Sequence, residues 1–375
     1  MSQYFVTGAT GVVGSAIVRE LLALQPQRLV LLIRASDAPG LQRRLATLLD
    51  FLGHDGATPP AAIEALRGDT ELPNFGLPQR DYEALCASTS HIIHSAASVR
   101  MNLPLEAARR SAVTACNNIL DLACHCQRLG VLHKLDLVST VGVGGRLPGP
   151  LPEHWITEAR QFHNSYEQAK AEAEVVIRRR IEEGLPATVH RPSMVVGESR
   201  SGRIPHFQIF YHLCEFLCGR RTRGWVPALG RGCLDLVPVD YVARSIVWAS
   251  GNASSAGQVL HLCAGPAGAL PLEALRTIVS ATFRRYGVAV PRSHKLPVAW
   301  LKAFARLCNR YAPEHWRLQL AALPVLLEYL AEEQSFANSR SRIFLQAAGI
   351  ALPRVQDFLP PVLDHYLRHR HSVSI

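Results

Sequence analysis

Three side chains, a hydroxyl, a phenol and an ammonium, have the types and spacing to transfer a proton to an oxygen. Tyr166 and Lys170 are four residues apart in a helical pattern, so both side chains lie on one helix face. A nearby lysine cation stabilises a phenolate, and we therefore expect Lys170 to lower the pKa of Tyr166 towards the working range. Upstream, Thr140 follows an apolar run and supplies a hydroxyl that can hydrogen-bond a carbonyl oxygen, a group that Ser139 also offers. Because a tyrosine and a lysine at this spacing occur by chance in many helices, the hydroxyl makes the pattern more specific.

A glycine-rich turn near the amino end indicates a dinucleotide-binding site. Its glycines are spaced three residues apart, between a β-branched run at 4–7 and an amphipathic helical pattern. Glycines let the backbone turn sharply and approach a pyrophosphate, whose charge then rests on the helix N-terminus. The cofactor-binding residues predicted in this turn are Gly8, Thr10, Gly11, Val12, Val13 and Gly14.

The residue that ends the second predicted strand indicates which dinucleotide binds. An Asp or Glu there would bind the adenosine ribose 2′-hydroxyl, whereas this chain has Arg34. A guanidinium suits a 2′-phosphate, so the sequence favours NADPH over NADH, although Asp37 nearby argues weakly against it. Arg44, in the next helical segment, is either a second phosphate ligand or an exposed helix charge. Lys170 is in addition a candidate ligand of the nicotinamide ribose.

Alternating strand and helix patterns over the first two thirds of the chain must hold these groups in place. Short apolar runs predict strands, and amphipathic segments between them predict helices. This alternation is typical of an α/β, Rossmann-type fold with a doubly wound parallel sheet. The predicted strands are 4–7, 29–33, a run ending near 68, 91–94, 135–139, 186–191 and 259–263, and the predicted helices between them are 15–24, 41–52 and 112–128.

After about residue 265 the strand pattern ends and helical patterns replace it. The sequence therefore predicts a Rossmann domain over 1–265, in which about 197–240 contributes to the substrate pocket. A smaller, mainly helical C-terminal subdomain over 266–375 would cap the substrate site. The helices expected in this subdomain are 272–286, 298–311, 316–333 and 355–369.

The composition is that of an ordinary globular protein. The chain has 375 residues, of which 48% are hydrophobic and 19% charged, which excludes a disordered protein. It lacks both the roughly 18 uninterrupted apolar residues of a membrane-spanning helix and a signal-peptide layout, so we expect a soluble, cytoplasmic protein. The nine cysteines have neither CxxC nor zinc-ligand spacing, so we expect core thiols and no metal site.

The formal net charge of +10 favours anionic partners. The candidate anionic partners are nucleic acid, an acidic carrier protein, the phosphates of CoA and a membrane surface. The arginine clusters at 178–180 and 220–223 lack the interleaved aromatic residues of a nucleic-acid stacking platform, so we expect no nucleic acid. A peripheral membrane contact through the helical tail stays open, and the sequence does not predict an oligomeric state.

The glycine turn, taken together with Thr140, Tyr166 and Lys170, resembles the extended form of the short-chain dehydrogenase/reductase superfamily. The three side chains match that superfamily's Ser/Thr–Tyr–Lys triad. Other segments resemble the branch that contains thioester reductase domains, carboxylic acid reductase terminal domains and fatty acyl-CoA reductases. They are 67–70 with 75–77, 91–99, 190–197 with 201–202, and 237–243. The segment 112–116 departs from the superfamily, because it lacks an Asn found in extended members, and 336–338 has Ala where an Asp is expected.

The resemblance implies further residues at the cofactor and a reaction. The cofactor-binding residues that it adds are Asp69, Thr70, Ala96, Ala97, Ser98, Pro192 and Ser193. The implied reaction is NADPH-dependent reduction of an acyl thioester, on CoA or on a carrier protein, to an aldehyde, with further reduction to the alcohol left open. Thr140 and Tyr166 would stabilise the oxyanion, and Tyr166 would protonate it. The alternatives are a dehydrogenase or epimerase acting on a sterol-like or nucleotide-sugar hydroxyl, and a protein that binds NADP without turnover.

Overall fold

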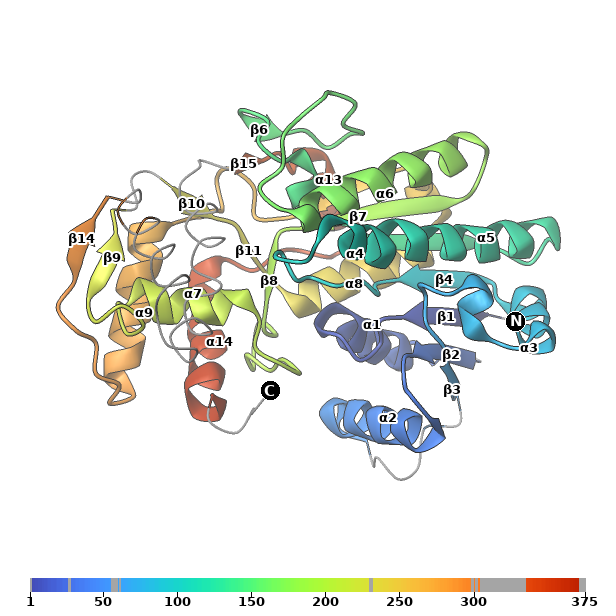
Figure 1. Ribbon diagram of the computed structural model, residues 1–375, viewed down its shortest axis with the longest axis horizontal. Helices are drawn as coiled ribbons and strands as arrows, with labels where there is room; N and C mark the ends of the chain where they lie inside the picture. Colours follow the sequence, from blue (N-terminus) through green and yellow to red (C-terminus); the bar gives the residue numbers. More distant parts are fainter. Residues whose placement is uncertain are drawn as a thin grey trace.

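A seven-stranded parallel sheet forms the centre of the computed structural model (Figure 1), which describes residues 2–25, 28–54, 60, 62–228, 232–297, 300, 303 and 335–370. The strand order is β12-β7-β5-β4-β1-β2-β3. All six pairings are parallel, so the Rossmann-type fold predicted from the sequence is confirmed. The strands are β1 (Gln3–Thr7), β2 (Arg28–Ile33), β3 (Ile63–Arg67), β4 (His91–His94), β5 (Lys134–Val138), β7 (Ala187–Pro192) and β12 (Val259–Leu262).

The central strands are apolar because helices cover both faces of the sheet. All five residues of β1 and five of the six in β2 are buried, as a parallel sheet covered on both sides requires. The chain order reverses between β1 and β4, which are neighbours in the sheet. In folds of this kind, ligands bind at such a reversal point, beyond the carboxyl ends of the strands.

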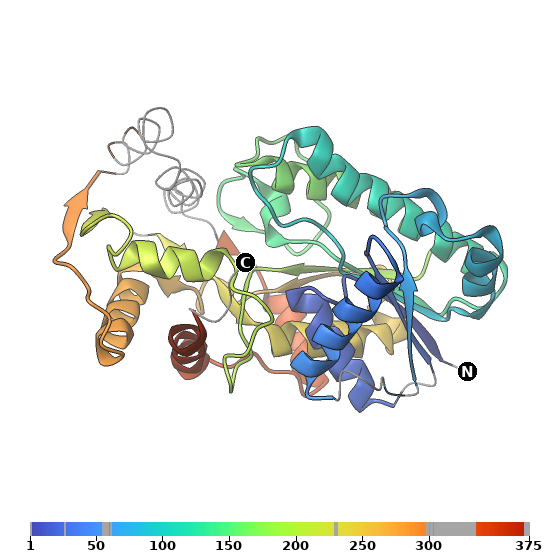
Figure 2. The ribbon, with the colours of Figure 1, turned by 60° about the horizontal axis from the view of Figure 1, so that its bottom comes forward.

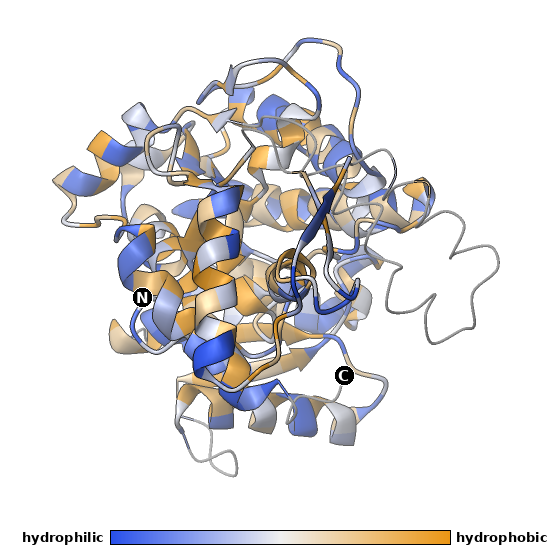
Figure 3. Ribbon diagram, turned by 90° about the vertical axis from the view of Figure 1, so that its left-hand side faces the viewer, coloured by the Kyte–Doolittle hydropathy of each residue, from blue (hydrophilic) through white to orange (hydrophobic). Residues whose placement is uncertain are grey.

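Two helical layers cover the sheet, and Figure 1 shows them on opposite sides. Each packs an apolar face into its own hydrophobic core, and Figure 3 shows that the helices carry both apolar and polar residues. One layer contains α1 (Val12–Ala23), α2 (Ala38–Leu52) and α8 (Val239–Ser250), and the other contains α3 (Gln79–Ser88), α5 (Ala115–Arg128) and α6 (Ser165–Glu182). The predicted helix at 112–128 differs at its start, where the short α4 (Leu105–Arg109) continues through a π-helical turn at Arg110–Thr114 before α5 begins.

A second group of elements lies beside the sheet, and Figures 1 and 2 show it on the side away from the N-terminus. Its helices share the hydrophobic core of the α1 layer, so the two regions are packed together. The helices are α7 (Ile209–Leu217), α9 (Leu272–Arg285) and α14 (Val355–His369). The predicted helices at 272–286 and 355–369 are present, whereas those at 298–311 and 316–333 lie, apart from residues 300 and 303, outside the described residues.

Short strands also occur in this region, so its described part is not purely helical. They form two-stranded pairs, β8 (Met194–Val196) with β11 (Leu236–Pro238), β9 (Trp225–Pro227) with β14 (His294–Leu296), and β10 (Cys233–Leu234) with β13 (Leu270–Pro271). Among the described helices, none has the length and the apolar character needed to span a bilayer.

The segment from residue 335 onward returns to the sheet. There β15 (Ser335–Phe336) pairs with β6 (Pro150–Leu151), and α13 (Ser339–Ala347) contacts β12 at the sheet edge. The backbone N–H of His261 donates to the Ser341 hydroxyl at 2.8 Å. The domain boundary near residue 265 stays a prediction, and this part of the predicted cap packs directly on the Rossmann sheet.

Candidate active site

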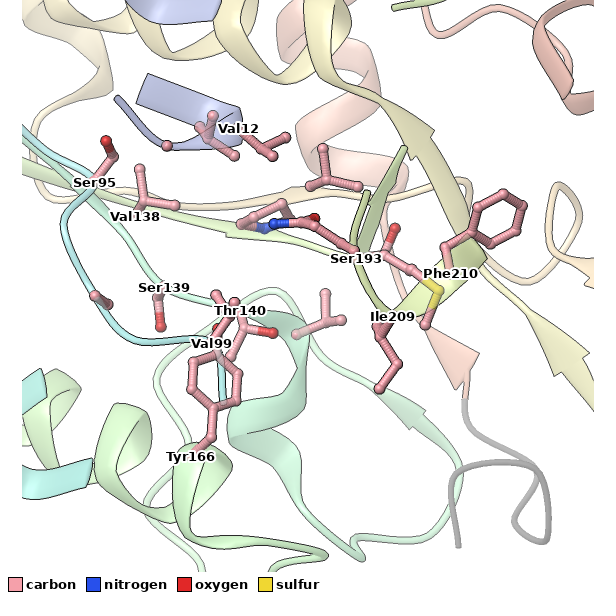
Figure 4. Close-up of a pocket in the computed structure, with 18 of the residues that line it drawn as sticks. Val12, Ser95, Val99, Val138, Ser139, Thr140, Tyr166, Ser193, Ile209 and Phe210 are labelled. Carbon is pink, nitrogen blue, oxygen red and sulfur yellow. The ribbon is translucent and has the colours of Figure 1, made fainter. Parts of the chain in front are cut away.

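A cavity of about 420 Å³ lies beyond the carboxyl ends of β1, β4, β5 and β7 (Figure 4). The residue runs that follow these strands meet at one edge because the strands are parallel. The cavity therefore contains the glycine turn, the predicted catalytic residues and part of the second region. The predicted site residues that line it are Gly8, Gly11, Val12, Val13, Gly14, Ala97, Thr140, Tyr166, Lys170, Pro192 and Ser193.

The glycine turn between β1 and α1 leaves no room for side chains at two positions. Gly8 has a φ of +75°, and a Cβ there would lie 2.6 Å from the backbone nitrogen of Ala96. A Cβ on Gly14 would lie 2.0 Å from the Gly8 carbonyl oxygen. The described helix α1 begins without a side-chain cap and without an acidic residue in its first turn. Its N-terminal N–H groups and its positive dipole end are thus suited to a phosphate group.

Four other predicted residues form a cluster outside the cavity wall. The guanidinium of Arg44 donates to the hydroxyl of Thr10 at 2.8 Å and to the carbonyl oxygen of Arg34 at 2.5 Å. The Arg34 guanidinium lies 3.7 Å from the carboxylate of Asp69, and its side chain is 70% exposed. Arg67, which no cofactor prediction included, donates to a backbone carbonyl of the loop after β2. These residues gather positive charge at the carboxyl ends of β2 and β3.

The three remaining predicted cofactor residues also lie outside the cavity lining. The N–H of Ala96 donates to the hydroxyl of Thr7 at 3.4 Å, which holds the loop after β4 against β1. The N–H of Ser98 donates to Ser111 in the π-helical turn at 2.8 Å. The carbonyl of Thr70 accepts from the Asn118 amide at 2.8 Å. Their observed contacts thus fix the backbone of the loops that surround the glycine turn.

The predicted catalytic residues meet at the end of β5. The phenol of Tyr166 hydrogen-bonds to Thr140, and Figure 4 shows the tyrosine ring beside that residue. The Thr140 hydroxyl also accepts from the N–H of Gly142 at 3.1 Å. The Lys170 ammonium donates to the carbonyl oxygen of Val138 at 2.8 Å. Ser139 differs from Thr140, because its hydroxyl donates to the buried carboxylate of Glu174.

The pKa values of the tyrosine and the lysine differ from the sequence expectation. Burial raises the pKa of Tyr166 to about 12; the hydrogen bond from Thr140 opposes this rise, and the charge of Glu167 adds to it. Burial lowers the pKa of Lys170 to about 8. The expected lowering of the Tyr166 pKa by Lys170 is therefore wrong for this structure, in which the ammonium is directed at the Val138 carbonyl. Desolvation of the phenol is the largest influence on the pKa of Tyr166.

The sequence missed much of the cavity wall. Residues 206–210, before and within α7, line it together with 233–235, Val99 and Phe336. Among them is the buried carboxylate of Asp235, which accepts from the Ser193 hydroxyl at 2.6 Å and from two backbone N–H groups. Burial raises the pKa of Asp235 to about 6. The sequence predicted that the region 197–240 contributes to the pocket, but it did not predict which of its residues line the cavity. For Asp235, the one available signal was an acidic residue within an apolar run.

The comparisons with known proteins identify the family. Residues 6–246 match the model of the NAD-binding family described as "male sterility protein". The chain belongs to this family. It is 32% identical over 69% of its length to aldehyde reductase lnaA of Aspergillus flavus and 30% identical over 69% to the nonribosomal peptide synthetase asaC of the same organism. It is also 29% identical over 66% to the L-2-aminoadipate reductase of Saccharomyces cerevisiae. The chain covers 25%, 26% and 19% of these relatives, respectively.

Solved structures share this fold. The terminal R domain from the myxalamid PKS-NRPS biosynthetic pathway has a TM-score of 0.81 and 25% identity, and the match covers 100% of this chain and 92% of that one. The thiolation-reductase di-domain from an archaeal nonribosomal peptide synthetase has a TM-score of 0.75 and 18% identity, covering 99% and 76%. The family member described here is an NAD(P)-dependent oxidoreductase of the extended short-chain dehydrogenase/reductase superfamily. A nicotinamide dinucleotide fits the glycine cradle and the uncapped start of α1.

Proposed function

We propose that this protein reduces an acyl thioester to an aldehyde with NADPH. The observation that carries the proposal is the joint position of Thr140 and Tyr166, which lie in one cavity with the glycine turn and an apolar wall. One end of this cavity suits a dinucleotide, and the other suits an acyl chain. Relatives named as peptide synthetases and aldehyde reductases support the same reaction class.

The preference for NADPH rests on the arginine cluster. Arg34 directly follows β2, where an acidic residue would bind a ribose 2′-hydroxyl, and Arg44 donates a hydrogen bond to its carbonyl oxygen. The 2′-phosphate of NADPH accepts charge-assisted hydrogen bonds from guanidinium groups, and NADH lacks this phosphate. The Arg44 guanidinium donates to the hydroxyl of Thr10, and the Arg34 guanidinium lies 3.7 Å from the carboxylate of Asp69.

The residues at the end of β5 and the start of α6 would hold the reacting carbonyl. NADPH, when bound, supplies a hydride to the carbonyl carbon of the thioester. Thr140 and Tyr166 hydrogen-bond the carbonyl oxygen and stabilise the charge that develops there. Because the pKa of Tyr166 is about 12, the phenol is protonated at neutral pH and gives its proton to this oxygen. The hemithioacetal formed in this way releases the thiol and leaves the aldehyde, and a second reduction would give the alcohol.

The apolar wall beyond these residues would receive the acyl chain. Its residues are Phe207 before α7, Ile209 and Phe210 at the start of α7, Leu234 of β10 and Phe336 of β15. An apolar chain buried against such a wall is stabilised by the hydrophobic effect, at about 25 cal/mol per Å² of apolar surface. The thiol end of the substrate would leave through the mouth of the cavity.

We propose a carrier-protein thioester as the substrate, with acyl-CoA as the second candidate. The similarity to a thiolation-reductase di-domain and to peptide synthetases supports a carrier. The net charge of +10 favours an acidic partner, although it also favours the phosphates of CoA.

The experiment compares one acyl group on a carrier protein and on CoA. NADPH consumption is recorded with purified protein, and the products are identified by mass. The variants are Tyr166→Phe and, as a matched control, Val175→Ala, whose side chain is exposed on the same helix. Aldehyde or alcohol formation that is lost only in Tyr166→Phe supports the proposal. Oxidation of a sterol or nucleotide-sugar alcohol without thioester reduction would overturn it.

A further inference from the structure

A buried ion pair joins β7 to α6, the helix that carries Tyr166 and Lys170. Arg191 on β7 is completely buried, and its Nε and Nη2 atoms donate to the two carboxylate oxygens of Glu174 on α6, at 2.9 and 2.5 Å. Glu174 also accepts from the hydroxyl of Ser139, which directly precedes Thr140. The pair therefore fixes α6, the helix of Tyr166, against the end of β5.

The third nitrogen of the same guanidinium points to the returning segment 335–341. Arg191 Nη1 donates to Nε2 of His261 on β12 at 3.2 Å and to the carbonyl oxygen of His154 at 3.0 Å. Nδ1 of His261 lies 2.7 Å from the carbonyl oxygen of Ala337. A ring nitrogen that accepts from a guanidinium carries no proton, so the proton of this neutral histidine lies on Nδ1 and is donated to Ala337. Burial, followed by the charge of Arg191, lowers the pKa of His261 to about 4, which keeps the ring neutral.

The returning segment itself contributes to the cavity. Phe336 lines the cavity wall, and Ala337 follows it directly in the chain. The N–H of His261 holds the same segment through the hydroxyl of Ser341. An unbroken series of hydrogen bonds thus runs from the segment at one side of the cavity, through His261 and Arg191, to Glu174 and Ser139 at the other.

A second buried pair in the same sheet provides a comparison. Lys134 and Asp136 on β5 are as deeply buried, and the lysine ammonium donates to the hydroxyls of Thr188 and Ser255. None of these four residues belongs to the cavity lining. Removing one partner of either pair leaves a buried charge without that partner, so we expect both substitutions to destabilise the fold. Only the pair formed by Arg191 connects the segments that surround the predicted catalytic residues.

We propose that Arg191 is a positioning residue that couples the packing of segment 335–341 to the placement of Thr140 and Tyr166. With the segment packed, Glu174 fixes two nitrogens of the guanidinium, and His261 fixes the third together with the His154 carbonyl. Glu174 is then held where it anchors Ser139 and the helix of Tyr166. The inference rests on the proposed function only in that Thr140 and Tyr166 are taken to contact the substrate.

The test uses three variants of the full chain and two measurements. Arg191→Met removes the guanidinium, Glu174→Gln keeps the shape but removes the charge, and Lys134→Met is the control. We measure kcat and KM for thioester reduction, and hydrogen–deuterium exchange at 139–144 and 335–341. All variants are compared at a temperature at which they are folded. We expect kcat to fall about tenfold or more in the first two variants, with the KM for NADPH unchanged, because small displacements of reacting groups reduce rates strongly.

The exchange measurement detects the coupling directly. We expect Arg191→Met to increase exchange in both segments, and Lys134→Met to leave exchange in both, as well as kcat, unchanged. Increased exchange in only one segment, or the same loss of kcat in Arg191→Met and Lys134→Met, would overturn the inference. If the wild-type protein reduces no thioester, the proposed function fails, but the exchange measurement still tests the coupling.

A milder variant covers the case in which Arg191→Met does not fold. In His261→Asn the amide can still donate to Ala337. Arg191 Nη1 loses its acceptor on residue 261 and keeps the His154 carbonyl. We expect a smaller fall in kcat, increased exchange at 139–144 and unchanged exchange at 335–341. An unchanged kcat together with unchanged exchange at 139–144 in this variant would contradict the coupling.

Discussion

The arginine cluster beside the glycine turn leads to a prediction about cofactor choice. We consider Arg34→Gln, Arg44→Gln and the double variant. Arg44 already uses two of its five donors, on Thr10 and on the Arg34 carbonyl. The Arg34 guanidinium lies 3.7 Å from the carboxylate of Asp69. Both guanidinium groups therefore retain donors for a 2′-phosphate.

The magnitude follows from the exposure of this cluster. A hydrogen bond to a charged group contributes about 1.5–3 kcal/mol, and the 70% exposure of the Arg34 side chain favours the lower end. A loss of about 1.4 kcal/mol corresponds to roughly tenfold in affinity. We therefore expect kcat/KM for NADPH to fall roughly tenfold in each single variant. The double variant should lose less than the product of the two, because neighbouring residues are not additive.

The assay measures kcat/KM for NADPH and for NADH with one thioester substrate. NADH has no 2′-phosphate, so its kcat/KM should change little in any variant. The advantage of NADPH should also shrink at high salt in the wild-type protein, because ions screen exposed charges. An equal fall for both cofactors, or an unchanged value for NADPH in the double variant, would refute the assigned role of the cluster.

Four further predictions concern residues that line the cavity. Burial holds the pKa of Lys170 at about 8, so kcat/KM for NADPH should decrease as the pH rises through about 8. If the same decrease remains in Lys170→Met, the role of Lys170 in binding the cofactor is contradicted. The unfolding free energy should instead increase from pH 8 to 10.5, because the unfolded chain binds this proton more tightly. Gly14→Ala places a Cβ 2.0 Å from the Gly8 carbonyl oxygen, so calorimetry should show lost NADPH binding, and normal binding would refute the close approach. Phe336→Ala removes an aromatic ring from the apolar wall and so enlarges the cavity. The ratio of kcat/KM for bulky acyl chains to kcat/KM for short ones should therefore rise; an unchanged ratio would place the acyl chain elsewhere.

The sequence predicted the sheet well because its physical signal is local. Each buried parallel strand is a short apolar run, and all seven were found within a few residues. Helix α3 was missed because only Tyr82, Leu85 and Cys86 are buried in it, which gives a weak periodic pattern. The π-helical turn before α5 was missed because one extra residue per turn leaves little trace in an apolar pattern.

The site was predictable where a motif is contiguous. The glycine turn and the Tyr166–Lys170 spacing lie within single segments, and the structure brings both to the cavity. Phe336 and Asp235 come from segments far away in the chain, so no local pattern connects them with the cavity. The direction of the Tyr166 pKa also escaped, because spacing shows which charges are near a phenol but not how deeply the phenol is buried.

The central claim, hydride delivery to a thioester carbonyl at the Thr140–Tyr166 pair, is tested most directly by isotope transfer. The protein is incubated with an acyl thioester and NADPH that carries deuterium at both C4 positions, and the product is analysed by mass spectrometry. We predict one deuterium at the carbonyl carbon of the aldehyde, or two at the same carbon of the alcohol, and loss of the labelled product in Tyr166→Phe. Consumption of NADPH without deuterium at that carbon, or unchanged labelling in Tyr166→Phe, would contradict the claim.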